Sequence, residues 1–120
     1  MQILGNKPPS SEEIGIFLNE ISFHLPDGYM EFMKNYNGAE ILFDETVLVL
    51  WPITDLISLN KEYCVSEFAP SFFLIGSDGG GEGYAINTIR GGIFRIPLIG
   101  MADDEAVFVS NSLAELLENL

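Results

Sequence analysis

The stretch from residue 72 to residue 98, FFLIGSDGGGEGYAINTIRGGIFRIPL, decides the fold class. It contains three short apolar runs separated by glycine-rich segments: FFLIGS at 72–77, GYAIN at 83–87 and GIFRIPL at 92–98. Short apolar runs bounded by turn residues predict β-strands. We expect Gly79–Gly80–Gly81 to form the first turn and Arg90–Gly91–Gly92 to close a hairpin. Because consecutive strands joined by short turns pair antiparallel, this stretch predicts a β-meander.

The flanking residues extend this meander in both directions. AEILF at 39–43 and TVLVLW at 46–51 are rich in apolar residues and are separated by Asp44–Glu45, which predicts two strands joined by a short turn. Pro52 ends the second of them, and a short helix containing Ile53, Leu56 and Ile57 is expected before a loop at Lys61–Glu62. Downstream, AVFV at 106–109 predicts a last short strand.

Helices are predicted toward both ends of the chain, after a short arm at residues 1–9. Ser10 or Ser11 is expected to cap the first helix, and a second helix starts near Asp27 and stops at Asn37–Gly38. Ser110 or Asn111 is expected to cap a C-terminal helix. In each predicted helix, apolar residues recur at i, i+3, i+4 and i+7 and form one face. These residues are Ile14, Phe17, Leu18 and Ile21 in the first helix, Tyr29, Phe32, Met33 and Tyr36 in the second, and Leu113, Leu116, Leu117 and Leu120 in the C-terminal helix.

This order of elements predicts an α+β fold. We expect a single domain over residues 1–120, with a twisted, mainly antiparallel sheet flanked by N-terminal and C-terminal helices that cover one face. A chain of 120 residues suits one domain better than two, and its 48% hydrophobic content supplies a core.

The charge balance is strongly acidic. Lys and Arg number 5 and Asp and Glu number 18, which gives a formal net charge of -13. Proteins that bind nucleic acid directly need cations to displace phosphate counterions, so this function is disfavoured. The same negative charge would attract a basic protein partner. Solubility alone is the other explanation of this charge.

Several other classes are also disfavoured. The chain has 1 Cys, so it forms no internal disulfide, which suits a reducing, cytoplasmic location. The N-terminal residues lack the pattern of a signal peptide. No apolar run approaches the 18 residues of a membrane span, so we expect no membrane partner.

The segment Ser77–Asp78–Gly79–Gly80–Gly81–Glu82 is the most conspicuous motif. A glycine run can present its N–H groups to a phosphate, but a P-loop needs Lys and then Ser or Thr after the glycines, and Glu82 follows here. The regular ligand spacing of a calcium loop is also missing. The segment is therefore interpreted as a wide turn, and neither a cofactor nor a metal is expected.

The sequence contains no recognisable catalytic set. His24 is the only histidine and is interpreted as a helix-end residue that favours the helix dipole when protonated. Cys64 is interpreted as a small buried hydrophobe, and Trp51 as a core anchor at a strand end. We therefore expect no enzymatic activity.

Taken in order, these residues resemble the SUKH superfamily, whose members include bacterial relatives of the yeast Smi/Knr cell-wall regulators. The resemblance spans about residues 10–118. It lies in Leu25–Pro26–Asp27 with Tyr29 and Phe32, Tyr36–Asn37–Gly38, Leu50–Trp51–Pro52–Ile53 with Leu56, and the run from Phe73 to Glu82 with Tyr84.

This resemblance implies an α+β fold with a twisted sheet, and a binding role. Bacterial members look like immunity proteins, which neutralise a cognate protein toxin, often a nuclease. The acidic balance fits a basic toxin. The candidate partner-binding residues are Asp78, Glu82, Asp103, Asp104 and Glu105, with Asp44 and Glu45 in reserve. Two alternatives stay open, namely a scaffold or regulatory module and a small-molecule binder or enzyme beside the Gly79–Gly81 turn. The oligomeric state is left open.

Overall fold

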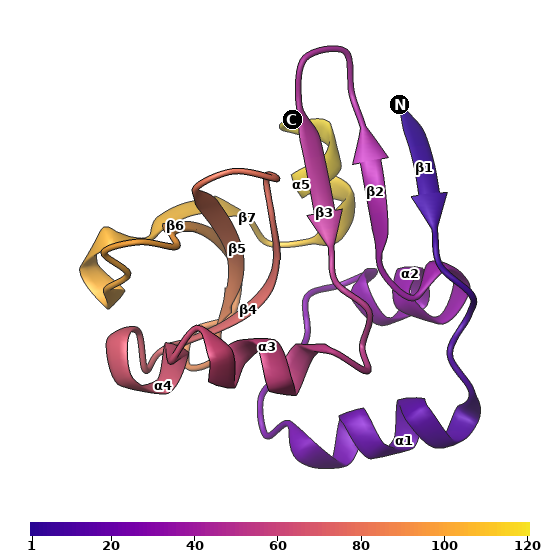
Figure 1. Ribbon diagram of the computed structural model, residues 1–120, viewed down its shortest axis with the longest axis horizontal. Coiled ribbons are helices and arrows are strands. Elements are labelled where there is room, and N and C mark those ends of the chain that lie inside the picture. The colour runs from indigo at the N-terminus through magenta and orange to yellow at the C-terminus, as the bar shows by residue number, and fades with distance from the viewer.

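The computed structural model describes residues 1–120 and contains one antiparallel sheet of seven strands in chain order (Figure 1). Every neighbouring pair is antiparallel, which confirms the predicted meander. The strands are β1 (Gln2–Gly5), β2 (Ala39–Leu42), β3 (Val47–Leu50), β4 (Phe72–Ser77), β5 (Glu82–Asn87), β6 (Ile93–Pro97) and β7 (Val107–Ser110).

Five α-helices and one short 3₁₀-helix accompany the sheet, so the α+β fold class is confirmed. None of these helices is long and apolar enough to cross a membrane. The helices are α1 (Ser11–Glu20), α2 (Tyr29–Tyr36), α3 (Leu56–Glu62), α4 (Val65–Phe68), η1 (Asp103–Glu105) and α5 (Leu113–Glu118).

The predicted N-terminal arm is wrong in part, because residues 2–5 form the edge strand β1. Its residues pair with β2 in the register Ile3↔Ile41 and Gly5↔Ala39. The segment QILG is too short and too weakly apolar to predict a strand alone. The hydrogen-bonding partners on β2, 34 or more residues away in the chain, stabilise it there.

Local capping agrees with the sequence at α1 and differs at α5. The Ser10 hydroxyl accepts a hydrogen bond from the Glu13 N–H, and the Glu13 carboxylate accepts one from the Ser10 N–H, which forms a capping box. At α5 the cap is Ser112 rather than Ser110 or Asn111, because Ser110 is still paired in β7.

Two further differences concern residues 56–68. The helix α3 extends through Lys61 and Glu62, which were expected to lie in a loop. The short helix α4 was not predicted, and it packs Val65 against the sheet.

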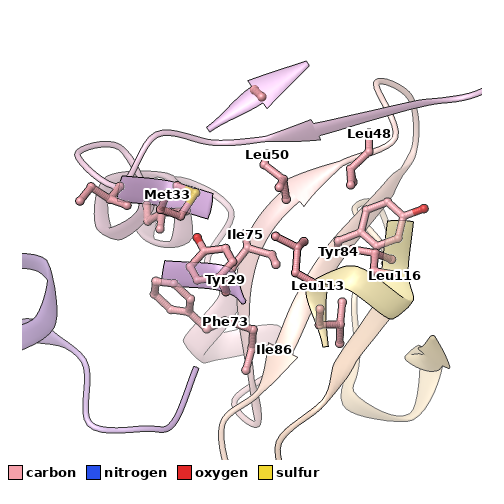
Figure 2. Packing of buried hydrophobic residues seen from close by; sticks show 14 of the residues in the cluster. Tyr29, Met33, Leu48, Leu50, Phe73, Ile75, Tyr84, Ile86, Leu113 and Leu116 are labelled. Atoms are coloured by element: carbon pink, nitrogen blue, oxygen red, sulfur yellow. The ribbon is translucent and has the colours of Figure 1, made fainter. Parts of the chain in front are cut away.

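The core lies on both faces of the sheet, so the expectation that the helices cover one face is wrong. Successive residues of a strand point to opposite faces. In β4, Phe73 and Ile75 belong to the larger cluster with residues of α1, α2, α3 and α5 (Figure 2). Phe72 and Leu74 belong to a smaller cluster with α4.

A side chain completes the backbone pairing of β4 where β3 has ended. The Asn60 amide on α3 donates to the Leu74 carbonyl at 3.0 Å and accepts from the Leu74 N–H at 2.8 Å. Because a buried backbone group without a partner is costly, this amide satisfies Leu74 and holds α3 against the sheet.

Candidate functional site

Two turns of the sheet and the last residues of the chain surround an open cavity of about 730 Å³, which we call the acidic cavity. The β2–β3 and β4–β5 turns lie at the same end of the sheet because these strands run antiparallel. The lining residues are Phe43, Asp44, Glu45, Thr46, Val47, Asp78, Glu82, Tyr84, Arg95, Asn119 and Leu120.

Asp78 organises the β4–β5 turn. Its carboxylate oxygen accepts hydrogen bonds from the Gly80 N–H at 2.8 Å and the Glu82 N–H at 3.2 Å. The Gly79 N–H donates to the Ser77 hydroxyl at 3.2 Å, and Gly79 has φ +81°, a conformation that favours glycine. The glycine run therefore forms the predicted wide turn, with the N–H groups of Gly79 and Gly80 already engaged inside it.

Glu82 and Arg95 form the one ion pair of the molecule, at 3.6 Å between Arg95 Nε and Glu82 Oε1. Both side chains are partly exposed, so the pair stabilises the fold by no more than about 1 kcal/mol. Four carboxylates, those of Asp44, Glu45, Asp78 and Glu82, therefore line the cavity with a single cationic side chain among them.

Tyr84 forms part of the wall beside these charges. Its ring is buried in the core, and its hydroxyl points away from the cluster (Figure 2). Burial raises the pKa of the Tyr84 hydroxyl, the carboxylates of Asp78 and Glu82 raise it further, and Arg95 lowers it. The hydroxyl therefore remains protonated, and so able to donate a hydrogen bond, at neutral pH.

The structure divides the sequence-predicted acids into two groups. Asp78 and Glu82 lie in the acidic cavity, and the reserve pair Asp44 and Glu45 joins them there. Asp103, Asp104 and Glu105 form η1, on the connection between β6 and β7.

This second group lies near the opposite end of the β4–β5 hairpin. The Asp103 carboxylate accepts hydrogen bonds from the Ser71 hydroxyl at 2.7 Å and from the Ser71 N–H at 3.3 Å, just before β4 begins. Asp103 and Asp104 line a separate hollow of about 450 Å³ together with Arg90 and Phe94. All three residues are exposed, and Asp103 differs from Asp104 and Glu105 in that it tethers the loop to Ser71.

Tyr84 and Arg95 are site residues that sequence reasoning missed. They are directly paired across β5 and β6, and Glu82 lies two residues before Tyr84 on the same face. The alternation along GYAIN and GIFRIPL places these side chains on one face, but only the hairpin register brings Arg95 to Glu82.

Two single-residue interpretations are wrong. Cys64 is exposed rather than buried, and it lies at the N-cap of α4 in a left-handed conformation with φ 55°. His24 does not lie in the last turn of a helix, since α1 ends at Glu20 and its cap is Ile21. Both side chains are exposed, and the fold contains no group of three or more His, Cys, Asp or Glu residues that could hold a metal ion.

A comparison with models of protein families matches residues 8–119 to the family described as SMI1 / KNR4 family (SUKH-1). The match covers nearly the whole fold, from the segment before α1 to the end of α5, and it confirms the resemblance found in the sequence. A comparison with curated proteins found no match.

Proposed function

Because the chain belongs to the SMI1 / KNR4 (SUKH-1) family, we propose that it is an immunity-type protein, which binds a cognate protein toxin and neutralises it by occlusion. The observation that carries the proposal is the acidic cavity, with four carboxylates around one open hollow. In this proposal the protein acts in the bacterial cytoplasm as a stoichiometric binder, without catalysis, cofactor or metal.

Charge complementarity supports a basic toxin as the partner. A nuclease must hold a phosphate backbone, and it does so with Lys and Arg side chains. Carboxylates placed at a similar spacing can occupy such a site in place of the phosphates. The net charge of -13 would also accelerate the encounter with a cationic protein and repel nucleic acid itself.

The cavity is partly preorganised for binding. Asp78 is held by the two hydrogen bonds of its own turn, and Glu82 lies on a central strand with Arg95 beside it. Side chains that are already ordered lose less conformational entropy on binding. Asp44 and Glu45 are exposed at the β2–β3 turn, and we propose that they make the first contacts with the toxin.

The three acidic residues of η1, Asp103, Asp104 and Glu105, form a proposed second contact area. The adjoining hollow contains Phe94, and half-exposed Phe108 packs against Phe94 at 5.5 Å between ring centroids. In protein–protein interfaces, most of the binding free energy commonly comes from a few aromatic or charged side chains.

The test uses the polypeptide encoded by the gene beside this one as the candidate toxin. We expect co-expression of the chain to restore growth of cells that produce the toxin, and the purified proteins to form a 1:1 complex. The double variant Asp44→Lys/Glu45→Lys is expected to slow association about tenfold, because it reverses two charges at the cavity.

The matched control is Glu62→Lys/Glu67→Lys, which makes the same change in net charge on exposed residues of α3 and α4. Its association rate should stay within about twofold of the normal chain at moderate salt, since exposed distant charges are screened. The proposal fails if the normal chain neither binds the polypeptide nor protects the cells. If both double variants slow association equally, the acidic cavity is not the contact site.

A further inference from the structure

The strands β1, β2 and β3 have one face that no helix covers. In Figure 1, α5 lies behind β3 and no helix lies in front of these three strands. Four aliphatic side chains of this face belong to neither core cluster, and they are Leu4, Leu42, Val47 and Val49. Leu4 is 46% exposed, and the other three are partly exposed.

The register of the sheet brings these side chains together around one carboxylate. Leu4, Glu40 and Val49 lie in one row across the three strands, and Gln2, Leu42 and Val47 lie in the next row. Glu40 is exposed and forms no ion pair. The face is therefore an aliphatic surface with a free negative charge at its centre.

This face ends at an open sheet edge. β1 is the first strand of the sheet and pairs only with β2, so the backbone groups on its outer side have no strand partner. Such an edge is a template for another strand, which would gain main-chain hydrogen bonds along Gln2–Gly5.

The edge is continuous with the acidic cavity. A further hollow of about 480 Å³ connects the start of β1 at Met1 with the β2–β3 turn, where it shares Asp44 and Glu45 with that cavity. The ionisable side chains on the open face and around this hollow are carboxylates, namely those of Glu40, Asp44 and Glu45, and the amino group of Met1 is the one cation beside them. A second copy of the chain would bring like charges together here, whereas a cationic partner would be attracted.

We propose that the partner docks by adding a β-strand to the edge of β1, with apolar side chains on the open face and Lys or Arg directed toward Glu40. This inference rests on the proposed function in one respect, namely that the partner is positively charged. Strands lie about 5 Å apart, so the added strand would lie about 10 Å from β2, and a long basic side chain together with the Glu40 side chain would span this gap over Leu4.

The test uses synthetic ten-residue peptides with the full chain, observed by NMR of the backbone amides. One peptide alternates Val with Lys, a second alternates Val with Glu, and a third is the Lys peptide with alternate backbone nitrogens methylated to prevent strand pairing. We expect the Lys peptide alone, at about 1 mM, to shift the Gln2–Gly5 amides and slow their hydrogen exchange.

Two variants sharpen the result. Glu40→Lys should weaken binding of the Lys peptide about fivefold, since a favourable charge pair becomes a repulsive one. Glu67→Lys, which makes the same charge change on α4, should alter binding less than twofold. The inference is overturned if the shifts occur at the other edge strand β7, if the three peptides bind equally, if none binds, or if sedimentation shows a dimer paired through β1.

These outcomes are separate from those of the proposed function. A Glu40→Lys chain that still binds and neutralises the toxin with normal kinetics overturns strand addition and leaves the immunity role standing. A normal chain that binds the Lys peptide through β1 but does not bind the toxin overturns the immunity role alone.

Discussion

Tyr29 shows how one buried polar atom connects burial to pH dependence. Its side chain is fully buried in the larger core cluster, and its hydroxyl has no hydrogen-bond partner (Figure 2). Burial disfavours the ionised form, so the pKa of Tyr29 is raised well above its ordinary value of 10.0.

Replacing Tyr29 with Phe should reduce the loss of stability at alkaline pH. Above about pH 10 the unfolded chain releases the tyrosine proton and the folded chain retains it, so this group lowers the free energy of unfolding by up to about 1.4 kcal/mol per pH unit. Urea unfolding of Tyr29→Phe from pH 9 to 11.5 should show a correspondingly shallower decline. Tyr36→Phe, at an exposed position, should keep the normal decline, and equal slopes for all three chains would contradict the assignment.

At the scale of elements, the contact between β3 and β4 depends on one glycine. The two strands pair only through Val49↔Ser77 and Leu50↔Gly76. A Cβ atom at position 76 would lie 2.1 Å from the Val49 carbonyl oxygen, closer than any real contact. A side chain at position 76 would therefore force these two strands apart.

Gly76→Val should lower the free energy of unfolding by about 3 kcal/mol, because the strands must separate to admit the side chain. Gly81→Val is the control, since no atom lies within 4 Å of its added Cβ and its φ is not left-handed. We expect the control to change stability by less than about 0.5 kcal/mol in chemical denaturation. A similar loss at both positions would mean that the whole glycine run is structural.

At the scale of the whole molecule, seven of the 18 acidic residues lie in two separate areas at opposite ends of the β4–β5 hairpin, and the others are spread over the rest of the chain, which carries a net charge of -13. One area surrounds the acidic cavity, and the other is η1 with its tether from Asp103 to Ser71. A long-range field of this kind acts mainly on the rate of encounter.

If the proposed toxin is the partner, its rate of association should therefore fall steeply as salt rises. The Debye length shortens from about 30 Å at 0.01 M salt to about 3 Å at 1 M, so the field no longer reaches the approaching partner. The dissociation rate should change less, because buried contacts govern it. Surface-based binding kinetics at several ionic strengths measure both rates. An association rate that does not change with salt would mean that the acidic surface contributes only to solubility.

Local patterns predicted most of the elements because their signals lie within a few residues. The capping serine and the i, i+3, i+4 spacing predict α1, and the apolar runs between glycine turns predict β4, β5 and β6. The strand β1 and the helix α4 were missed because neither has an apolar run or a clear helical spacing of its own, and each is stabilised by pairing or packing with distant segments.

The sequence alone also determined the net negative charge of the chain and its family, since composition and an ordered set of short motifs need no coordinates. Only the tertiary structure decided which acids lie together. Asp44 and Glu45 are more than 30 residues from Asp78 in the chain, and the antiparallel register of β2, β3, β4 and β5 brings both turns to one cavity. Asp103, Asp104 and Glu105 are no farther from Asp78 in sequence, yet the connection between β6 and β7 carries them away, because loop path and strand register are set by packing across the whole sheet.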